Sequence, residues 1–319
     1  DMLIKKGEKV FLLGDNGCGK TTLLNILAGR MRPTEGSYYL GSHVEEAYYE
    51  QTMTSLDPEA TVLREVWDRY YTTISHKDIC NALAAFLFRG DEIEKQIKLL
   101  SGGEAARVQL LKLMLTKANL LLLDEPFAAI DAKVRQELRS WLKEMIEKLG
   151  VTSIFVTHDQ DEAIEVADEI IITNKGRIEQ IGTPMEIYQK PQTAFSASFF
   201  GQTTVLDDYT KFKTFDVVDG ADKAIVRPEF IKITKLNEPF RQKASVSVGE
   251  VVKTAFRGNN IEVTVKCDGG VINGVRGLEE PAVYHGEKVN VFLYRLFVTK
   301  GDNAFILENK SLTEESVVI

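Results

Sequence analysis

Short apolar runs alternate with amphipathic stretches over the first two hundred residues. Val10–Leu13 and Leu120–Leu123 are continuous apolar runs, and together with Ser153–Val156 they predict buried strands. Apolar residues recur at helical spacing in Glu104–Thr116, and the charged stretch Asp131–Lys148 also predicts a helix. Strands that are apolar throughout are typical of a parallel sheet with helices on both faces. This part of the chain is therefore predicted to be α/β.

Beyond Gly201 the pattern changes to alternating apolar and polar residues, many of them β-branched. The segments that predict strands by this pattern are Ile225–Ile233, Ser245–Val252, Ile261–Cys267 and Lys288–Val298. Turn-forming sequences at 258–260 and 268–270 separate some of them. We predict a small antiparallel sandwich or barrel here, so that residues 1–201 form one domain and residues 202–319 a second.

Composition narrows the class of protein. The 319 residues include 39 Lys and Arg against 47 Asp and Glu, which gives a net charge of −8 and argues against binding nucleic acid mainly by charge. Three scattered cysteines, Cys18, Cys80 and Cys267, argue against a zinc site or a disulfide framework and are typical of a reducing compartment. The longest strongly apolar run, Ala82–Phe88, is too short for a membrane span. We expect a cytoplasmic protein.

The segment Gly-Asp-Asn-Gly-Cys-Gly-Lys-Thr has the spacing of a phosphate-binding loop, and it stands between a predicted strand and a predicted helix, Thr21–Ala28. Backbone N–H groups of such a loop bind phosphate oxygens, and the helix N-terminus adds a favourable dipole. Lys20 would reach the β- and γ-phosphates, and Thr21 would ligate Mg²⁺. The predicted nucleotide-binding residues here are Gly14, Asp15, Asn16, Gly17, Cys18, Gly19, Lys20, Thr21 and Thr22. The alternative is a glycine turn with a chance lysine.

The apolar run at 120–123 ends in two acidic residues, Asp124 and Glu125. In a phosphate-loop protein, an aspartate at the end of a buried strand associates with magnesium. Glu125 would then polarise the attacking water as a general base. The structural alternative is that both acids cap the next helix.

A Leu-Ser-Gly-Gly-Glu sequence stands directly before a predicted helix. A serine and two glycines at a helix start can bind a second phosphate surface through backbone amides. The predicted binding residues are Ser101, Gly102, Gly103 and Glu104. The alternative is an ordinary helix N-cap.

The order of these motifs, followed by Val-Thr-His-Asp at 156–159, resembles the nucleotide-binding domain of ATP-binding cassette (ABC) proteins. The resemblance implies that Gln51 belongs to a glutamine loop that contacts Mg²⁺, that Asp131 belongs to the D-loop, and that His158 is the switch histidine at the γ-phosphate. It implies ATP and Mg²⁺ as cofactors. It also implies a homodimer, in which the segment at Ser101 closes over ATP held by the other subunit.

The resemblance differs along the chain. Residues 7–124 resemble the F subfamily of ribosome-associated ABC ATPases, and from about residue 126 the chain resembles sulfate/thiosulfate import ATPases, with an OB-like regulatory domain at its end. This change near residues 124–126 implies a mosaic, either natural or joined from two gene fragments. Only thirteen residues precede Gly14, which implies a cassette without its first strands and without the aromatic residue that stacks on adenine.

The β-rich end favours the importer interpretation. We expect the ATP-hydrolysing subunit of a sulfate/thiosulfate importer, bound to membrane permease subunits on the inner face of the cell membrane. Two alternatives stay open: an F-type ATPase that acts on the ribosome, and a nucleotide-binding module without turnover.

Overall fold

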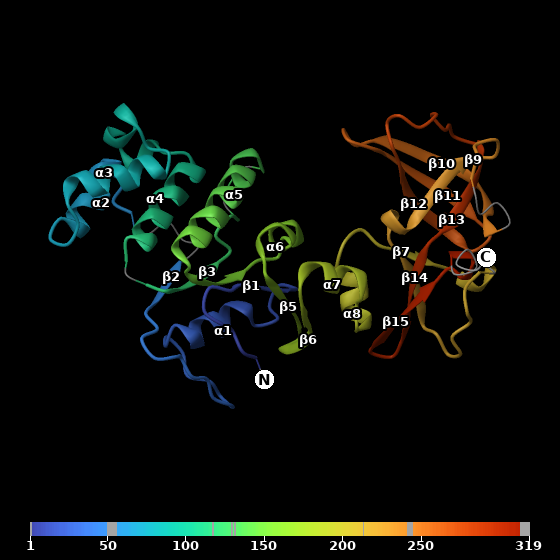
Figure 1. Cartoon of the computed structure of the whole chain (residues 1–319), viewed down its shortest axis with the longest axis horizontal. Helices are drawn as coiled ribbons and strands as arrows, with labels where there is room; N and C mark the ends of the chain where they lie inside the picture. Colours follow the sequence, from blue (N-terminus) through green and yellow to red (C-terminus); the bar gives the residue numbers. More distant parts are fainter. Residues whose placement is uncertain are drawn as a thin grey trace, which may run out of the picture. The chain divides into compact units, whose positions relative to one another are not determined.

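The structure is a computed structural model, which describes residues 2–49, 56–116, 118–128, 130, 132–212, 214–240 and 245–312. The chain divides into two compact units, Asp1–Pro184 and Met185–Ile319 (Figure 1). This division comes before the predicted boundary near Gly201. The reason is that helix α8 (Ala194–Phe199) contacts strands β14 (Arg295–Lys300) and β15 (Asn303–Glu308) of the second unit.

The described residues of the first unit form a six-stranded sheet in the order β2-β3-β4-β1-β5-β6. Its strands are β1 (Lys9–Gly14), β2 (Glu46–Tyr49), β3 (Leu120–Asp124), β4 (Thr152–Val156), β5 (Glu169–Asn174) and β6 (Arg177–Gly182). Five strands run parallel, and β6 is antiparallel to β5. The strands predicted at 10–13, 120–123 and 153–156 are confirmed. They are adjacent in the sheet, which explains why each is apolar along its length.

Helices cover this sheet on both faces (Figure 1). Helix α1 (Lys20–Leu27) lies on one face, where Leu24 and Leu27 pack against Val10, Leu122 and other buried residues. Helices α5 (Ala132–Leu149) and α6 (Gln160–Val166) lie on the other face (Figure 1). The predicted helices at 21–28, 104–116 and 131–148 are confirmed, with ends that differ by one or two residues.

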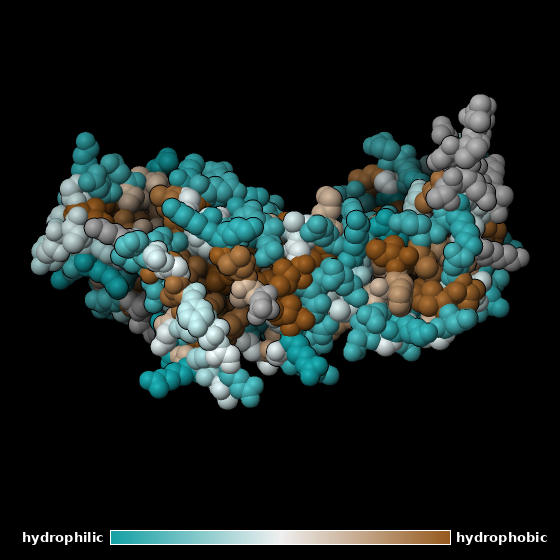
Figure 2. All heavy atoms as spheres, turned by 60° about the horizontal axis from the view of Figure 1, so that its bottom comes forward, coloured by the Kyte–Doolittle hydropathy of each residue, from teal (hydrophilic) through white to brown (hydrophobic). Residues whose placement is uncertain are grey.

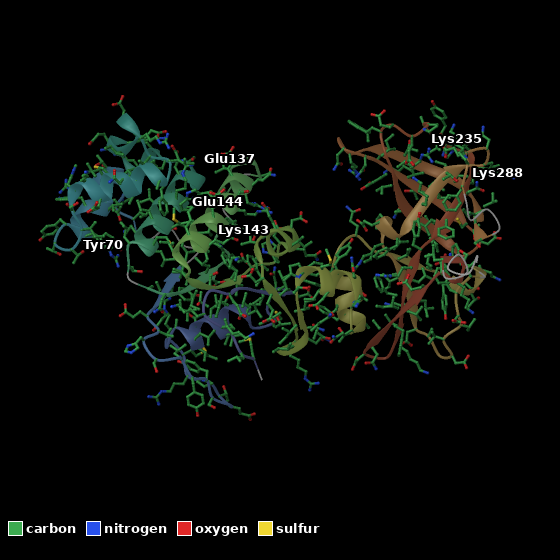
Figure 3. All side chains as sticks on the ribbon, in the orientation of Figure 1. Tyr70, Glu137, Lys143, Glu144, Lys235 and Lys288 are labelled. Carbon is green, nitrogen blue, oxygen red and sulfur yellow. The ribbon has the colours of Figure 1, made fainter. Side chains whose placement is uncertain are left out.

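Three further helices lie together beside the sheet: α2 (Val62–Tyr70), α3 (His76–Ala85) and α4 (Gly102–Met114). Thr61 caps α2 and Ser75 caps α3, because each side chain accepts a hydrogen bond from a backbone N–H of the first helical turn. Tyr70 joins α2 to α4 (Figure 3), since its hydroxyl donates to the carbonyl oxygen of Lys112 at 2.6 Å. This bond holds the last turn of α4 against α2.

The described residues of the second unit form two antiparallel sheets, β12-β11-β10-β13-β9 and β15-β14-β8-β7. Besides β14 and β15, the strands are β7 (Thr204–Leu206), β8 (Lys223–Val226), β9 (Ile231–Lys235), β10 (Ser247–Phe256), β11 (Ile261–Cys267), β12 (Gly270–Arg276) and β13 (Lys288–Leu293). The edge strands β12 and β9 also contact each other, so the five-stranded sheet curls towards a barrel. A shared core of Val, Ile, Leu and Phe side chains fills this unit. The predicted antiparallel β domain is confirmed.

Two of the predicted strands are each two strands, and this part of the prediction was wrong. The segment 225–233 contains β8 and β9, separated by the turn Pro228–Phe230, because proline has no N–H to continue a ladder. The segment 288–298 contains β13 and β14, separated at Tyr294, whose N–H donates to the carbonyl of Phe230 instead. At both breaks the chain passes from one sheet to the other.

Hydrophilic residues cover much of the face drawn in Figure 2, and hydrophobic residues show between them. Of the helices in the described part of the chain, none combines the length and the apolar character needed to cross a bilayer.

Candidate nucleotide-binding site

Backbone geometry explains the glycines of the phosphate-loop sequence. A Cβ atom on Gly14 would lie 2.1 Å from the carbonyl oxygen of Thr173 on β5, so a side chain has no room there. Gly19 is the N-cap of α1 and has a φ of 101°, in the left-handed region that favours glycine. The loop therefore connects the end of β1 to the start of α1, as the motif requires.

Lys20 is a buried cation held by its own loop. The residue is only 7% exposed, and Nζ donates to the carbonyl oxygens of Gly14 at 2.8 Å and of Asp15 at 3.0 Å. Among the residues that the structure describes, no carboxylate lies within ion-pair distance of this ammonium group. Burying a charge without a counter-ion is unfavourable, so a bound anion would stabilise this arrangement. The residues present fit a phosphate group.

The rest of the loop divides into exposed and buried residues. Asp15, Asn16 and Gly17 are exposed, as are Thr21 and Thr22 at the start of α1. Cys18 is buried, and its Sγ lies 3.2 Å from Oγ1 of Thr173. The Cys18 side chain therefore anchors the loop to β5. Only the backbone of Cys18 would be able to contact a nucleotide.

Thr21 and Asp124 meet at the same edge of the sheet. The hydroxyl of Thr21 donates to Oδ1 of Asp124 at 3.2 Å. Burial raises the pKa of the Asp124 carboxyl above its ordinary value, and hydrogen bonds from Thr21 and Tyr48 oppose this shift. A hydroxyl and a partly desolvated carboxylate at this distance fit Mg²⁺, which prefers oxygen ligands. Gln51, the third predicted ligand, lies outside the described residues.

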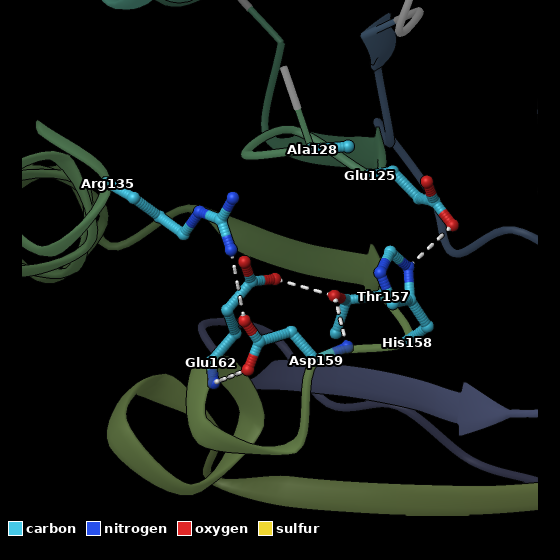
Figure 4. Close-up of a pocket in the computed structure, with 7 residues that line it drawn as sticks. All are labelled: Glu125, Ala128, Arg135, Thr157, His158, Asp159 and Glu162. Atoms are coloured by element: carbon cyan, nitrogen blue, oxygen red, sulfur yellow. Dashed lines mark hydrogen bonds and ion pairs between the residues drawn. The ribbon is translucent and has the colours of Figure 1, made fainter. Parts of the chain in front are cut away.

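Glu125 and His158 lie side by side (Figure 4). Nδ1 of His158 is 3.2 Å from Oε1 of Glu125. Glu125 directly follows β3, and His158 follows the neighbouring strand β4, so both stand at the carboxyl edge of the parallel sheet. The backbone φ of Glu125 is 45°, a conformation that costs energy for a non-glycine residue and that occurs often at functional sites. The predicted base and switch histidine are therefore adjacent.

Hydrogen bonds fix the segment that carries His158 (Figure 4). The hydroxyl of Thr157 donates to Oε2 of Glu162 at 2.6 Å, and the N–H of Asp159 donates to Oγ1 of Thr157 at 3.0 Å. The Asp159 carboxylate caps α6 and forms an ion pair with Arg135 of α5 at 3.4 Å. Sequence reasoning missed Arg135, Thr157 and Glu162 as parts of the site. An acidic residue three positions after an N-cap is a weak local signal for Glu162.

The Ser-Gly-Gly-Glu segment starts α4. The N–H of Glu104 donates to Oγ of Ser101 at 3.3 Å, and the N–H of Ser101 donates to Oε2 of Glu104 at 2.7 Å, which makes a capping box. A Cβ atom on Gly103 would lie 2.4 Å from Cγ1 of Val134 on α5, so this glycine permits close packing of the two helices. The segment therefore acts as a helix N-cap and as a packing contact, and phosphate binding by it stays a prediction. Asp131 lies outside the described residues.

Known proteins resemble this chain over most of its length. The ABC transporter family matches residues 1–128. The spermidine/putrescine import ATP-binding protein PotA of Clostridium acetobutylicum is 34% identical over 302 aligned residues, which cover 83% of this chain and 81% of that protein. This chain belongs to the ATP-binding subunits of ABC transporters. PotA of Clostridioides difficile is 35% identical, with 83% and 82% coverage.

A solved structure supports the fold of the ABC ATPase unit. The cbiO1 protein of Clostridium perfringens, described as part of the ABC transporter complex cbiONQ, superposes with a TM-score of 0.52 at 26% identity. The match covers 59% of this chain and 82% of that protein. The predicted ABC cassette fold is confirmed, and the chain is an ABC ATPase.

Two finer expectations are not supported. The relatives are named for spermidine and putrescine, so the sulfate/thiosulfate assignment finds no support in them. An alignment that covers 83% of the chain must cross residues 124–126, so one relative matches the sequence on both sides of the expected junction. The mosaic interpretation is therefore not supported.

Proposed function

We propose that this chain is the ATP-hydrolysing subunit of an ABC importer and couples ATP binding and hydrolysis to a membrane permease. The main support is the buried ammonium group of Lys20 at the start of α1, which has no carboxylate within ion-pair distance among the described residues. An anion at this position would lie beside the Thr21–Asp124 pair. The same sheet edge carries Glu125 and His158.

Each group has a separate role in this proposal. Lys20 and the loop amides bind the β- and γ-phosphates. Thr21, Asp124 and Gln51 hold Mg²⁺, which when bound would neutralise charge on the phosphate oxygens. Glu125 polarises the attacking water as a general base. His158, at 3.2 Å from Glu125, orients this carboxylate and contacts the γ-phosphate.

We further propose that two copies of the chain hold ATP between them. Ser101, Gly102, Gly103 and Glu104, together with Asp131, would close over the nucleotide bound to the loop of the other copy. Conformational work then comes from the difference in ATP affinity between the open and closed dimers, because a ligand shifts an equilibrium only by its differential affinity. Hydrolysis converts ATP to ADP and phosphate. This removes the ligand that favours the closed dimer, so the dimer opens.

For the solute we propose a polyamine. Both relatives described above are named for spermidine and putrescine import, and each covers 83% of this chain. On this proposal the chain lies on the inner face of the cell membrane, bound to permease subunits.

Reconstitution tests the proposal. The chain is combined with its permease in vesicles, and uptake of labelled spermidine and of labelled sulfate is measured with and without ATP. We expect ATP hydrolysis to rise when permease is present, and ATP-dependent uptake of spermidine only. Uptake of sulfate alone would overturn the choice of solute. ATP-dependent co-sedimentation with ribosomes, without any effect of permease, would overturn the importer assignment.

A further inference from the structure

Tyr48 lies one strand away from the proposed magnesium ligands. It is on β2, which pairs in parallel with β3 so that Tyr48 is opposite Leu122. Opposite residues, and residues two apart on one strand, project from the same face of a sheet. Tyr48 and Asp124 therefore share a face, and it is the face on which α1 packs.

The hydroxyl of Tyr48 reaches Asp124 directly. It donates to Oδ2 of this carboxylate at 3.1 Å. The other oxygen, Oδ1, accepts the hydrogen bond from Thr21 at 3.2 Å. Because the two oxygens have donors on different elements, β2 and α1, the carboxylate is fixed in one orientation.

The ring of Tyr48 is itself held in place. The guanidinium group of Arg30, just after α1, lies 4.1 Å from the ring centroid. The ring also packs against the apolar cluster that contains Leu122 and Leu24. A phenol that is fixed by an apolar cluster and by a cation over its face presents its hydroxyl in one direction.

We propose that Tyr48 is a positioning residue for the magnesium site. Its hydroxyl holds Oδ2 of Asp124, so that Oδ1 stays directed towards Thr21, where the metal would bind. This inference rests on the proposed function, since it assumes that Thr21 and Asp124 hold Mg²⁺. Hydrogen-bond partners of ligating carboxylates generally contribute to metal affinity.

The variant Tyr48→Phe tests the proposal, because it removes the hydroxyl and keeps the ring. Binding of ADP is measured by titration calorimetry in EDTA and over a range of Mg²⁺ concentrations. We expect the variant to need about tenfold more Mg²⁺ for its half-maximal effect, with unchanged affinity for ADP in EDTA. ADP is not hydrolysed in this measurement, so the result does not depend on turnover.

Tyr49→Phe is the matched control. Tyr49 is the next residue on β2 and is buried on the opposite face, so its loss of a hydroxyl should leave the Mg²⁺ dependence unchanged. If Tyr48→Phe has the Mg²⁺ dependence of the parent protein, the inference is wrong. A weaker affinity for ADP in EDTA with unchanged Mg²⁺ dependence would also overturn it, by showing a general structural role. If Lys20→Ala leaves ADP binding intact, the proposed function itself fails.

Discussion

Nδ1 of His158 lies 3.2 Å from Oε1 of Glu125, and the two residues follow neighbouring parallel strands. The same pair of strand ends carries Asp124, so the proposed magnesium ligand and the proposed general base, Glu125, are consecutive residues. His158 is well exposed, whereas Glu125 is mostly covered. On the proposed function, His158 can therefore contact a ligand at the carboxyl edge of the sheet while its Nδ1 orients the Glu125 carboxylate.

Replacing Glu125 by Gln should abolish most turnover and leave ATP binding intact. The amide cannot accept a proton from water, and loss of a general base typically lowers a rate about 10²–10⁴-fold. The measurements are phosphate release and ATP titration, and we also expect ATP to trap a dimer in size-exclusion chromatography. Glu144→Gln, an exposed position on α5, is the control (Figure 3). A change in rate below about threefold would mean that another group activates the water.

Lys20→Ala should weaken ATP binding about 10- to 100-fold, because it removes charge-assisted hydrogen bonds to phosphate. Isothermal titration with ATP measures the effect. Lys143→Ala removes a lysine from α5, where Nζ donates to the carbonyl of Glu165, and should leave the affinity unchanged (Figure 3). Equal affinities of Lys20→Ala and the parent protein would contradict the phosphate-loop assignment.

Gly103→Ala should lower the free energy of unfolding by about 1–3 kcal/mol, because the new methyl group overlaps with Val134. Chemical denaturation measures this change. Val134→Ala in the same chain should restore much of the loss, since it removes the atom that lies 2.4 Å from the added Cβ. If the double variant is no more stable than Gly103→Ala, the packing of α4 on α5 does not explain this glycine.

Glu162→Gln should change how stability depends on pH. Burial raises the pKa of the Glu162 carboxyl above its ordinary value of 4.5. Between 4.5 and the raised value the folded protein binds more protons than the unfolded chain, so this group lowers stability as pH rises through that window. Glutamine does not titrate and keeps a side-chain oxygen to accept the hydrogen bond from Thr157.

The thermal midpoints of both proteins over pH 4 to pH 7 check this prediction. The thermal midpoint of the variant minus that of the parent protein should increase as pH rises, and it should be lowest at pH 4. Groups far from residue 162 are the same in both proteins, so the difference reports on Glu162 and the charged residues around it. A difference that stays constant with pH would contradict the prediction.

Much of the first unit could be predicted because its signals are local. The apolar runs at 120–123 and 153–156 are long enough to mark buried strands by themselves, and the phosphate-loop sequence defines its own strand and helix. The breaks at Pro228 and Tyr294 were harder to predict. At both positions the chain passes between two sheets, and this depends on packing between segments far apart in the sequence.

In the candidate site, too, some residues could be predicted from local motifs and others could not. Lys20, Thr21 and Asp124 belong to contiguous motifs whose chemistry follows from their spacing. Tyr48 and Arg135 belong to no such motif. Their contacts with Asp124 and Asp159 arise from the pairing of β2 with β3 and from the position of α5, which only the folded structure provides.

Two carbonyl oxygens of its own loop hold the ammonium group of Lys20 in place. On the proposed function, a triphosphate would therefore meet a cation whose side chain lost its conformational entropy during folding. Binding would replace the two carbonyl dipoles by negatively charged phosphate oxygens at nearly the same place. Such preorganisation favours affinity. A singly charged anion would replace the two carbonyl oxygens with a smaller electrostatic gain than a triphosphate would.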